Sequence, residues 1–276
     1  MADDPRRSGE ADMPGLDLLY DLASCLRFYS RLPVPRLPGE PDPHLPPDFR
    51  TVPRMLPLAG LLLAVPAALV LLAGRGLGLG PFLAATLAVA TLVLVTGALH
   101  EDGLADVADG FGGGADPARR LEIMRDSRIG AYGGAALVLA FALRIGALAT
   151  LLDRTGAAAA VALILAASLS RTAALAPMVL LLPARPGGAS ASVGRPSKAA
   201  TGLAGLLALV LVLLALPFGL PFGGLVLMPV LAVAASIAVT ALARARIGGQ
   251  TGDVVGACQQ AAEIGALLGL IVAVPM

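Results

Sequence analysis

Aromatic and charged residues are scarce in this chain. It has no Trp, three Tyr and seven Phe among 276 residues, and 14% of its residues are charged against 57% that are hydrophobic. A soluble protein needs far more polar surface than this to cover its core. The composition therefore excludes an ordinary soluble domain, although the shortage of Trp and Tyr also leaves almost no aromatic belt of the kind that often marks a membrane interface.

Cysteine is also scarce, and the first residues do not have the pattern expected of a secretory leader. Cys25 and Cys258 lie far apart in sequence and neither has metal or redox spacing, so we expect two reduced thiols without a catalytic role. Residues 1–14 are polar and contain no short apolar core followed by a small-residue cleavage site. Membrane insertion is therefore expected to use the first spans themselves.

Long uncharged runs dominate the rest of the chain. Phe82–Leu99, Ala199–Leu216 and Gly224–Leu242 hold no charged or amide side chain and are rich in Leu, Ala, Val and Gly. Since a helix needs about 20 apolar residues to cross a bilayer, the pattern predicts an all-α, polytopic helical membrane protein. About seven transmembrane spans are expected, at residues 55–73, 81–99, 132–152, 157–182, 200–217, 222–243 and 254–274.

The N-terminal region differs from these spans. Residues 1–15 are predicted to be a disordered tail, and residues 16–276 a single integral membrane catalytic domain. Apolar residues recur at helical spacing over Leu16–Leu32, which suits either a helix lying in the membrane interface or an amphipathic helix packed on protein. The proline-rich segment Pro33–Pro53 should be extended and irregular.

Basic residues alternate between the two sides of the predicted bundle. The N-terminal region and the loops after the second, fourth and sixth spans hold 16 of the 20 basic residues, whereas the opposite side has only Arg75 and Arg154. The positive-inside rule then predicts a cytoplasmic (inner) membrane protein whose N-terminus and basic loops face the cytoplasm.

Three charged residues fall inside predicted spans, where charge is costly. Arg144 and Arg171 lie in the third and fourth spans and Glu263 lies in the last. Either arginine could pair with Glu263 as a structural tie, or reach a substrate phosphate.

The acidic motif, residues 100–110, reads His-Glu-Asp-Gly-Leu-Ala-Asp-Val-Ala-Asp-Gly and begins where the second span leaves the membrane. On a continuing helix Asp102, Asp106 and Asp109 would lie within about 60° of one another, with Glu101 pointing elsewhere. Repulsion along such a stripe is relieved by a hard divalent cation such as Mg²⁺. The stripe extends over about 10 Å, so all three aspartates cannot easily ligate one ion. The alternative is a solvated acidic face at a helix end.

Glycine-rich and basic loops follow on the same predicted side. Arg125 and Arg128 stand before the third span, where they could grip phosphate or simply fix topology. The loop at residues 185–198 is basic and rich in hydroxyl groups, which suits closure over an anion or a plain linker. Asp253, in a glycine-rich stretch, could add a carboxylate to the same ion or cap the last helix.

Taken together, these stretches resemble the cobalamin synthase family, also called adenosylcobinamide-GDP ribazoletransferases. The resemblance rests on four stretches that run from near the N-terminus to the final span: Arg31–Pro35, His100–Asp109, Asp126–Gly133 and Gly248–Ala257. The acidic stretch and the Thr-Gly-Asp stretch are specific as a pair, and neither would be so alone.

The resemblance implies that a hydroxyl of α-ribazole, or of its 5′-phosphate, attacks the cobinamide phosphate of adenosylcobinamide-GDP and that GMP leaves. It also implies Mg²⁺ as cofactor, membrane lipid as a partner, no nucleic acid, and homo-oligomers as an open question. The expected metal ligands are Asp102, Asp106, Asp109 and Asp253. The expected catalytic residues are His100, Glu101, Asp102 and Asp106, with His100 or Glu101 as candidate proton acceptor. The expected substrate contacts are Ser127, Arg128, Arg195, Lys198, Gln250 and Thr251.

Two other functions fit parts of the pattern. A CDP-alcohol phosphotransferase would carry Asp-Gly-x-x-Ala-Arg, but here Asp102-Gly103 is followed by Leu-Ala-Asp-Val without the Arg. A cation-coupled transporter would place carboxylates near the bilayer midplane, whereas here only Glu263 is deep.

Overall fold

The computed structural model describes residues 15–40, 42–43, 45–185 and 193–275. Within these ranges the regular structure is helical, apart from one isolated β-bridge between Pro183 and Gln250. The all-α prediction is confirmed. The predicted N-terminal tail, except Gly15, and residues 186–192 of the predicted basic loop lie outside the described residues.

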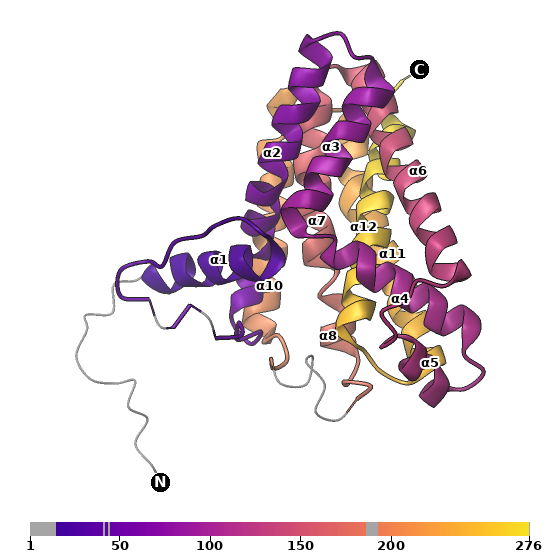
Figure 1. Ribbon diagram of the computed structural model, residues 1–276. Coiled ribbons are helices and arrows are strands. Elements are labelled where there is room, and N and C mark those ends of the chain that lie inside the picture. Colours follow the sequence, from indigo (N-terminus) through magenta and orange to yellow (C-terminus); the bar gives the residue numbers. More distant parts are fainter. Residues whose placement is uncertain (1–14, 41, 44, 186–192, 276) are drawn as a thin grey trace.

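Long apolar helices form the body of the protein (Figure 1). Six segments of the described chain are long and apolar enough to cross a membrane, or seven if α3 and α4 count as one broken span, which agrees with the predicted number. The straight spans are α2 (Leu56–Gly76), α6 (Ala131–Thr155), α7 (Ala158–Ala173) with α8 (Ala176–Leu180), α10 (Lys198–Leu214), α11 (Phe222–Ile247) and α12 (Gly252–Ala273).

The second predicted span is shorter than its apolar run. Helix α3 (Pro81–Thr96) ends at Thr96, and α4 (Leu99–Gly113) leaves at 90°. Gly97 and Ala98 make the turn with φ of 64° and 57°, a left-handed conformation that is rare for alanine. The prediction that the span continues to residue 99 was therefore wrong by three residues, because apolar composition does not reveal a bend. Helix α4 runs across the end of the bundle, outside the spans (Figure 1).

Small residues hold the spans close together. A Cβ on Gly60 of α2 would lie 2.7 Å from the Ala167 carbonyl oxygen of α7. On α12, Gly265 and Gly269 approach the α11 backbone equally closely, at Leu231 and Leu227. The hydrophobic effect does not drive helices together inside a bilayer, so the van der Waals contacts that these glycines allow stabilise the helix pairs. Helix α12 lies at the centre and packs against α4, α6, α7 and α11.

Helix α1 (Leu16–Tyr29) extends sideways from the bundle (Figure 1). Its buried face, which includes Cys25 and Tyr29, packs on the protein near the short helix η2 (Val52–Met55), while Leu19 and Phe28 are exposed. One of the two alternatives, packing on protein, is therefore present for one face, and a position in the membrane interface stays a prediction for the exposed face. The following segment is irregular, as predicted.

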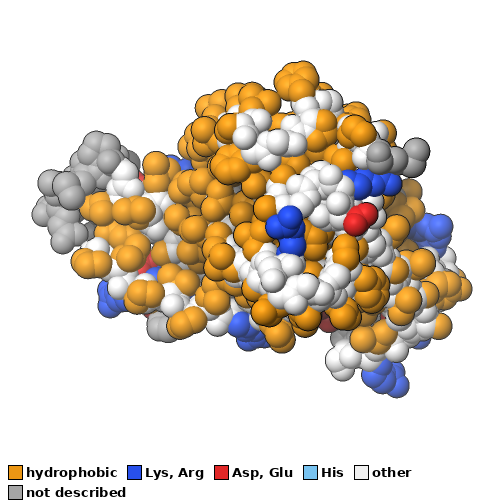
Figure 2. Space-filling view, turned by 90° about the horizontal axis from the view of Figure 1, so that it is seen from above, with side chains coloured by type: hydrophobic (Ala, Val, Ile, Leu, Met, Phe, Trp, Pro, Cys, Tyr) orange, Lys and Arg blue, Asp and Glu red, His pale blue; other side chains and the backbone are white. Residues whose placement is uncertain are grey.

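The two ends of the bundle differ in charge. Helix α5 (Pro117–Ile123), the start of α12 and the end of α11 lie at the same end as α4 (Figure 1). Figure 2 looks at the other end, where η3 (Leu216–Phe218) joins α10 to α11 and few charged side chains appear. The loops predicted to be basic thus gather at the end that carries the acidic motif.

Candidate functional site

The acidic motif forms most of α4, so it is helical, but this helix is separate from α3 and is not the continuation of the span on which the spacing argument relied. Asp102 is exposed, and Asp106 and Asp109 are half-buried. Glu101 and His100 are buried, with 5% and 4% of their surface exposed. The helix therefore presents its aspartates outward and sends Glu101 and His100 into the protein.

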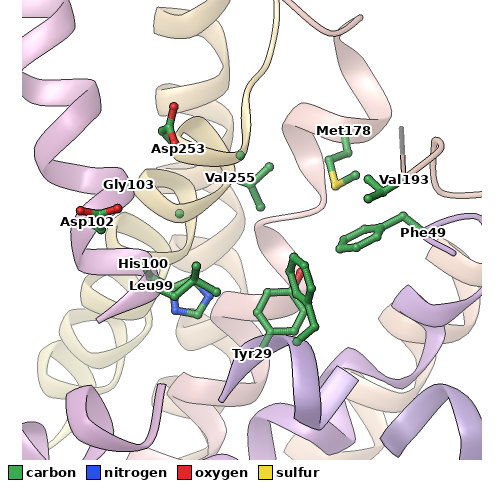
Figure 3. Close-up of a pocket in the computed structure, with 13 residues that line it drawn as sticks. Tyr29, Phe49, Leu99, His100, Asp102, Gly103, Met178, Val193, Asp253 and Val255 are labelled. Atoms are coloured by element: carbon green, nitrogen blue, oxygen red, sulfur yellow. The ribbon is translucent and has the colours of Figure 1, made fainter. Parts of the chain in front are cut away.

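Two glycines bring α4 against the start of α12. A Cβ on Gly103 would lie 2.8 Å from the carbonyl oxygen of Asp253, and one on Gly256 would lie 3.4 Å from the Cα atoms of Gly103 and His100. A side chain larger than hydrogen at Gly103 would force the helices apart. This contact places Asp102 and Asp253 on neighbouring backbones at one cavity, as Figure 3 shows.

The carboxylates at this end of the bundle are close enough for their charges to interact. Burial is the main cause that raises the pKa of Asp106 to about 7, and the negative charges of Asp102, Asp253 and Asp109 raise it further. Arg185 opposes the shift. A carboxylate surrounded in this way is stabilised by any cation that arrives. The structure therefore brings Asp102, Asp106 and Asp253 into one electrostatic unit, which we call the acidic site.

Asp109 has different neighbours. Its two carboxylate oxygens accept hydrogen bonds from the backbone amides of Gly130, at 2.7 Å, and Gly133, at 2.9 Å. These amides belong to the first turn of α6, where an anion compensates the unpaired N–H groups. Asp109 therefore ties α4 to α6, and its predicted role as a metal ligand stays a prediction.

Glu101 joins a buried network inside the bundle. Arg144 of α6 donates to Glu101 at 2.7 Å and to Glu263 of α12 at 2.9 Å. Gln260 donates to Glu101, and Gln259 donates to Glu263. One of the two alternatives for Arg144, the structural tie to Glu263, is thus present. Glu101 does not line the cavity beside Asp102, so its contacts favour a structural role, and its catalytic role stays a prediction.

Arg171 is the second buried arginine. It is 3% exposed and donates to the carbonyl oxygen of Ala167, one turn earlier on the same helix. Its Nε atom is buried with no hydrogen-bond partner among the described residues. Of the two alternatives for Arg171, a direct pair with Glu263 is not formed, although Glu263 lies close enough to act on it electrostatically.

An apolar cavity of about 220 Å³ opens beside the acidic site (Figure 3). Its aromatic walls come from α1 and from Phe49, and Asp102 and Asp253 line its polar side. The His100 ring lies parallel to the Tyr29 ring, with centroids 5.8 Å apart. Burial lowers the pKa of His100 well below its usual value, and nearby arginines lower it further. The imidazole is therefore neutral at physiological pH.

The last predicted loop is built around backbone contacts. Thr251 caps α12 by accepting a hydrogen bond from the amide of Val254, so the predicted alternative that Asp253 is the cap was wrong. The Thr251 hydroxyl also donates to Asp253 at 3.2 Å. The backbone of Gln250 pairs with Leu182 and Ala184, while its side-chain oxygen is buried without a partner among the described residues. The substrate roles of Thr251 and Gln250 stay predictions.

The predicted phosphate-binding side chains are dispersed. Arg128 is exposed and pairs with Asp126, and Ser127 beside it is exposed as well. Arg195 donates to the carbonyl oxygen of Val179, and Lys198 is exposed at the start of α10. The structure does not bring these four side chains together at the acidic site.

A different arginine lies near the acidic site. Arg185 lines a cavity of about 300 Å³ with Arg125 and Glu122, and its Nε atom is buried without a partner among the described residues. Burial lowers the pKa of Arg185 first, then the like charge of Arg125, while Asp253 and Asp106 oppose this. Sequence reasoning placed Arg185 only in a basic loop, because its approach to Asp106 depends on the bridge between residues 183 and 250.

The acidic site has the donor chemistry for Mg²⁺. Its ligands would be carboxylate oxygens, and they already repel one another. Among the described residues, no three His, Cys, Asp or Glu side chains are close enough together to hold one metal ion. This agrees with the expectation that Asp102, Asp106 and Asp109 cannot easily all ligate one ion. The residues fit an ion held by one or two carboxylates and completed by substrate phosphates, as is usual for Mg²⁺.

Fold and site define a class: a polytopic helical membrane protein with an acidic site and an apolar cavity at one end of its bundle. The comparisons with known proteins give the family. The family model described as cobalamin-5-phosphate synthase matches residues 21–271, so the chain belongs to that family.

Its curated relatives include three named adenosylcobinamide-GDP ribazoletransferase. The protein of Azorhizobium caulinodans is 48% identical over 255 residues, which cover 92% of this chain and 96% of that protein. The protein of Xanthobacter autotrophicus is 49% identical over 260 residues, 92% and 97% of the two chains. The protein of Bradyrhizobium diazoefficiens is 43% identical over 260 residues, 93% and 96%. No solved structure matches the chain.

Proposed function

We propose that this protein transfers the cobinamide phosphate of adenosylcobinamide-GDP to α-ribazole or its 5′-phosphate and releases GMP. The function follows from family membership and from relatives of that name over almost their whole length. The observation that carries it in the structure is the meeting of Asp102, Asp106 and Asp253 beside a cavity that can hold part of a substrate.

The transfer needs little covalent help from the protein. An acceptor hydroxyl oxygen forms a bond to the phosphorus that carries cobinamide, the bridging P–O bond breaks, and GMP leaves with the electrons of that bond. The hydroxyl proton passes to a base or to water. Such a displacement depends on positioning the two reactants and on neutralising the phosphate charge.

We propose Mg²⁺ as the cofactor, held by one or two carboxylates of the acidic site (Asp102, Asp106 and Asp253) together with substrate phosphates. The ion would supply charge neutralisation at the pyrophosphate when bound. The exposed position of Asp102 and the half-buried positions of Asp106 and Asp253 suit ligands that must also admit a substrate phosphate.

Arg185 and Arg125 suit the phosphates of the donor. Both line the second cavity together with Glu122. The buried Nε atom of Arg185 has no hydrogen-bond partner among the described residues, so it can still donate to an anion. An anion between the two arginines would relieve the repulsion of their like charges and accept charge-assisted hydrogen bonds. The acidic site lies close enough to act on Arg185 electrostatically.

The activity test uses purified protein in nanodiscs with adenosylcobinamide-GDP, α-ribazole and Mg²⁺, and it measures GMP release. Asp102→Asn and Asp106→Asn should each reduce turnover by at least 100-fold while the protein stays inserted and folded. Asp153→Asn, an exposed aspartate at the opposite end of the bundle, should keep wild-type turnover. Absence of GMP release by folded wild-type protein would refute the proposed function.

We also propose that the acidic site faces the cytoplasm from the inner membrane, since most basic residues gather at its end of the bundle. Cys25 and Cys258 are fully buried, so they should stay unlabelled in a cysteine-accessibility experiment. In intact spheroplasts an impermeant maleimide should label Ala157→Cys, and it should label Ser127→Cys only after lysis. The reverse pattern would refute this orientation.

A further inference from the structure

The cavity beside the acidic site is built from aromatic rings. Phe28 and Tyr29 end α1, with ring centroids 4.8 Å apart, and Phe49 lies edge-on to Phe28 at 5.5 Å. Met178 lies next to Phe49 and Val193 in the lining (Figure 3). The Tyr29 ring is stacked on His100, so the wall continues from α1 to α4. Such walls favour a planar aromatic guest through ring contacts and sulfur–aromatic contacts.

Size limits the guest to one ring system. The cavity holds about 220 Å³, below the roughly 300–1,000 Å³ of pockets that enclose drug-sized ligands. A corrin with its amide side chains is far larger than this space. The two candidates that remain among the substrates of the proposed function are the guanine of the donor and the benzimidazole of the acceptor.

Polarity separates these two bases. Apart from three glycines, the lining side chains are hydrocarbon, aromatic ring or sulfur except at Tyr29, His100 and the two aspartates. Guanine carries several hydrogen-bond donors and acceptors along its edge, and each that is buried unpaired costs about 1–3 kcal/mol. Ribazole has a benzimidazole with methyl groups on its outer edge and a single free ring nitrogen. The cavity therefore suits the acceptor's base and not the donor's.

The hydroxyl of Tyr29 can donate a hydrogen bond to that single ring nitrogen. No described residue exchanges a hydrogen bond with it. Burial also raises the pKa of Tyr29 above its usual value, so the hydroxyl stays protonated and able to donate. The acidic side of the cavity, at Asp102 and Asp253, is where the ribosyl part of the same molecule would meet the phosphate.

We propose that the cavity lined by Tyr29, Phe49 and Met178 is the binding site for the benzimidazole base of the acceptor. This inference rests on the proposed function, because it assigns one of its two substrates to a place. It makes the N-terminal helix α1 part of the substrate site.

The test measures KM separately for α-ribazole and for adenosylcobinamide-GDP, and it measures binding of α-ribazole alone and of GMP alone by calorimetry in nanodiscs. Phe49→Ala should raise the KM and Kd for α-ribazole about tenfold, since one aromatic contact is worth about 0.5–1.5 kcal/mol. The KM for the donor and GMP binding should stay unchanged. Phe82→Ala, an exposed phenylalanine at the opposite end, is the matched control.

Tyr29→Phe keeps the ring and removes only the hydroxyl, and Val255→Phe fills the cavity without removing any wall. Both should weaken α-ribazole binding selectively, which keeps the test valid if Phe49→Ala does not fold. Weaker GMP binding with unchanged α-ribazole binding would assign the cavity to guanine and overturn the inference. Unchanged binding of both ligands in all folded variants would overturn it too. Failure of the proposed function would instead appear in the wild-type protein, as absent GMP release.

Discussion

Arg144 holds Glu101 and Glu263 at once, at 2.7 and 2.9 Å, although these residues lie 43 and 119 positions away from it in sequence. Glu101 precedes Asp102 on α4, and Glu263 lies on α12 two to three turns after Asp253. A single guanidinium therefore fixes both helices that carry the acidic site. Arg144 fixes α4 and α12 relative to each other inside the bundle, and the contact at Gly103 brings the same two helices together beside Asp253.

Replacing Arg144 should be costly. Arg144→Gln leaves two carboxylates buried without their partner, and we expect the free energy of unfolding to fall by about 3–5 kcal/mol. Titration with SDS in mixed micelles measures this. Arg154→Gln, exposed at the end of the same helix, is the control and should change stability by no more than about 0.5 kcal/mol. Equal stability of the two variants would show that the network is not structural.

The glycine contact between α4 and α12 should matter for turnover. Gly103→Ala places a methyl group 2.8 Å from the Asp253 carbonyl oxygen, so the helices must separate. A displacement of about 1 Å at a reacting centre can cost roughly 100-fold in rate, and we expect a loss of that order in GMP release. Gly202→Ala on α10 meets nothing within 4 Å and should keep full activity. Full activity in Gly103→Ala would mean that the close approach is dispensable.

Asp109 should behave differently from Asp106. Asp109→Ala removes the acceptor for two amides of the first turn of α6, and the loss of a helix cap costs about 0.5–2 kcal/mol. Hydrogen exchange at Gly130 and Gly133 should become faster. Asp109→Asn keeps one acceptor oxygen, so it should retain most of the Mg²⁺ affinity that Asp106→Asn loses. An equal loss of Mg²⁺ affinity in both would make Asp109 a ligand, as the sequence predicted.

Arg185 should contribute to donor binding. Arg185→Gln and Arg125→Gln each remove a charged donor from the second cavity, and a hydrogen bond to a charged group is worth about 1.5–3 kcal/mol. We expect the KM for adenosylcobinamide-GDP to rise about 10- to 100-fold with little change in the KM for α-ribazole. The control is Arg119→Gln, an exposed arginine of α5 that pairs with Glu122. If Arg119→Gln raises the KM for adenosylcobinamide-GDP by the same factor, the effect comes from the overall positive charge of this end and not from contacts of Arg185 and Arg125.

Composition and periodicity alone determined the class of fold. Runs of uncharged residues about as long as a bilayer crossing are stable in lipid as helices, because backbone groups there must be paired internally. The distribution of basic residues along the chain was enough to predict that the basic loops gather at one end. Helical spacing was enough to predict that Asp102, Asp106 and Asp109 point away from Glu101. These features are local, or depend on the membrane as a solvent, and so they are visible in the sequence.

The tertiary structure decided which of these residues act together. The left-handed turn at Gly97 and Ala98 sends α4 across the bundle, and no run of apolar residues announces such a turn. The partners of Asp109, Glu101 and Arg185 come from segments far away in the chain, where pairing depends on how helices pack. The aromatic cavity likewise needs α1, Phe49 and Met178 to meet beside the acidic site, and only the folded chain brings them there.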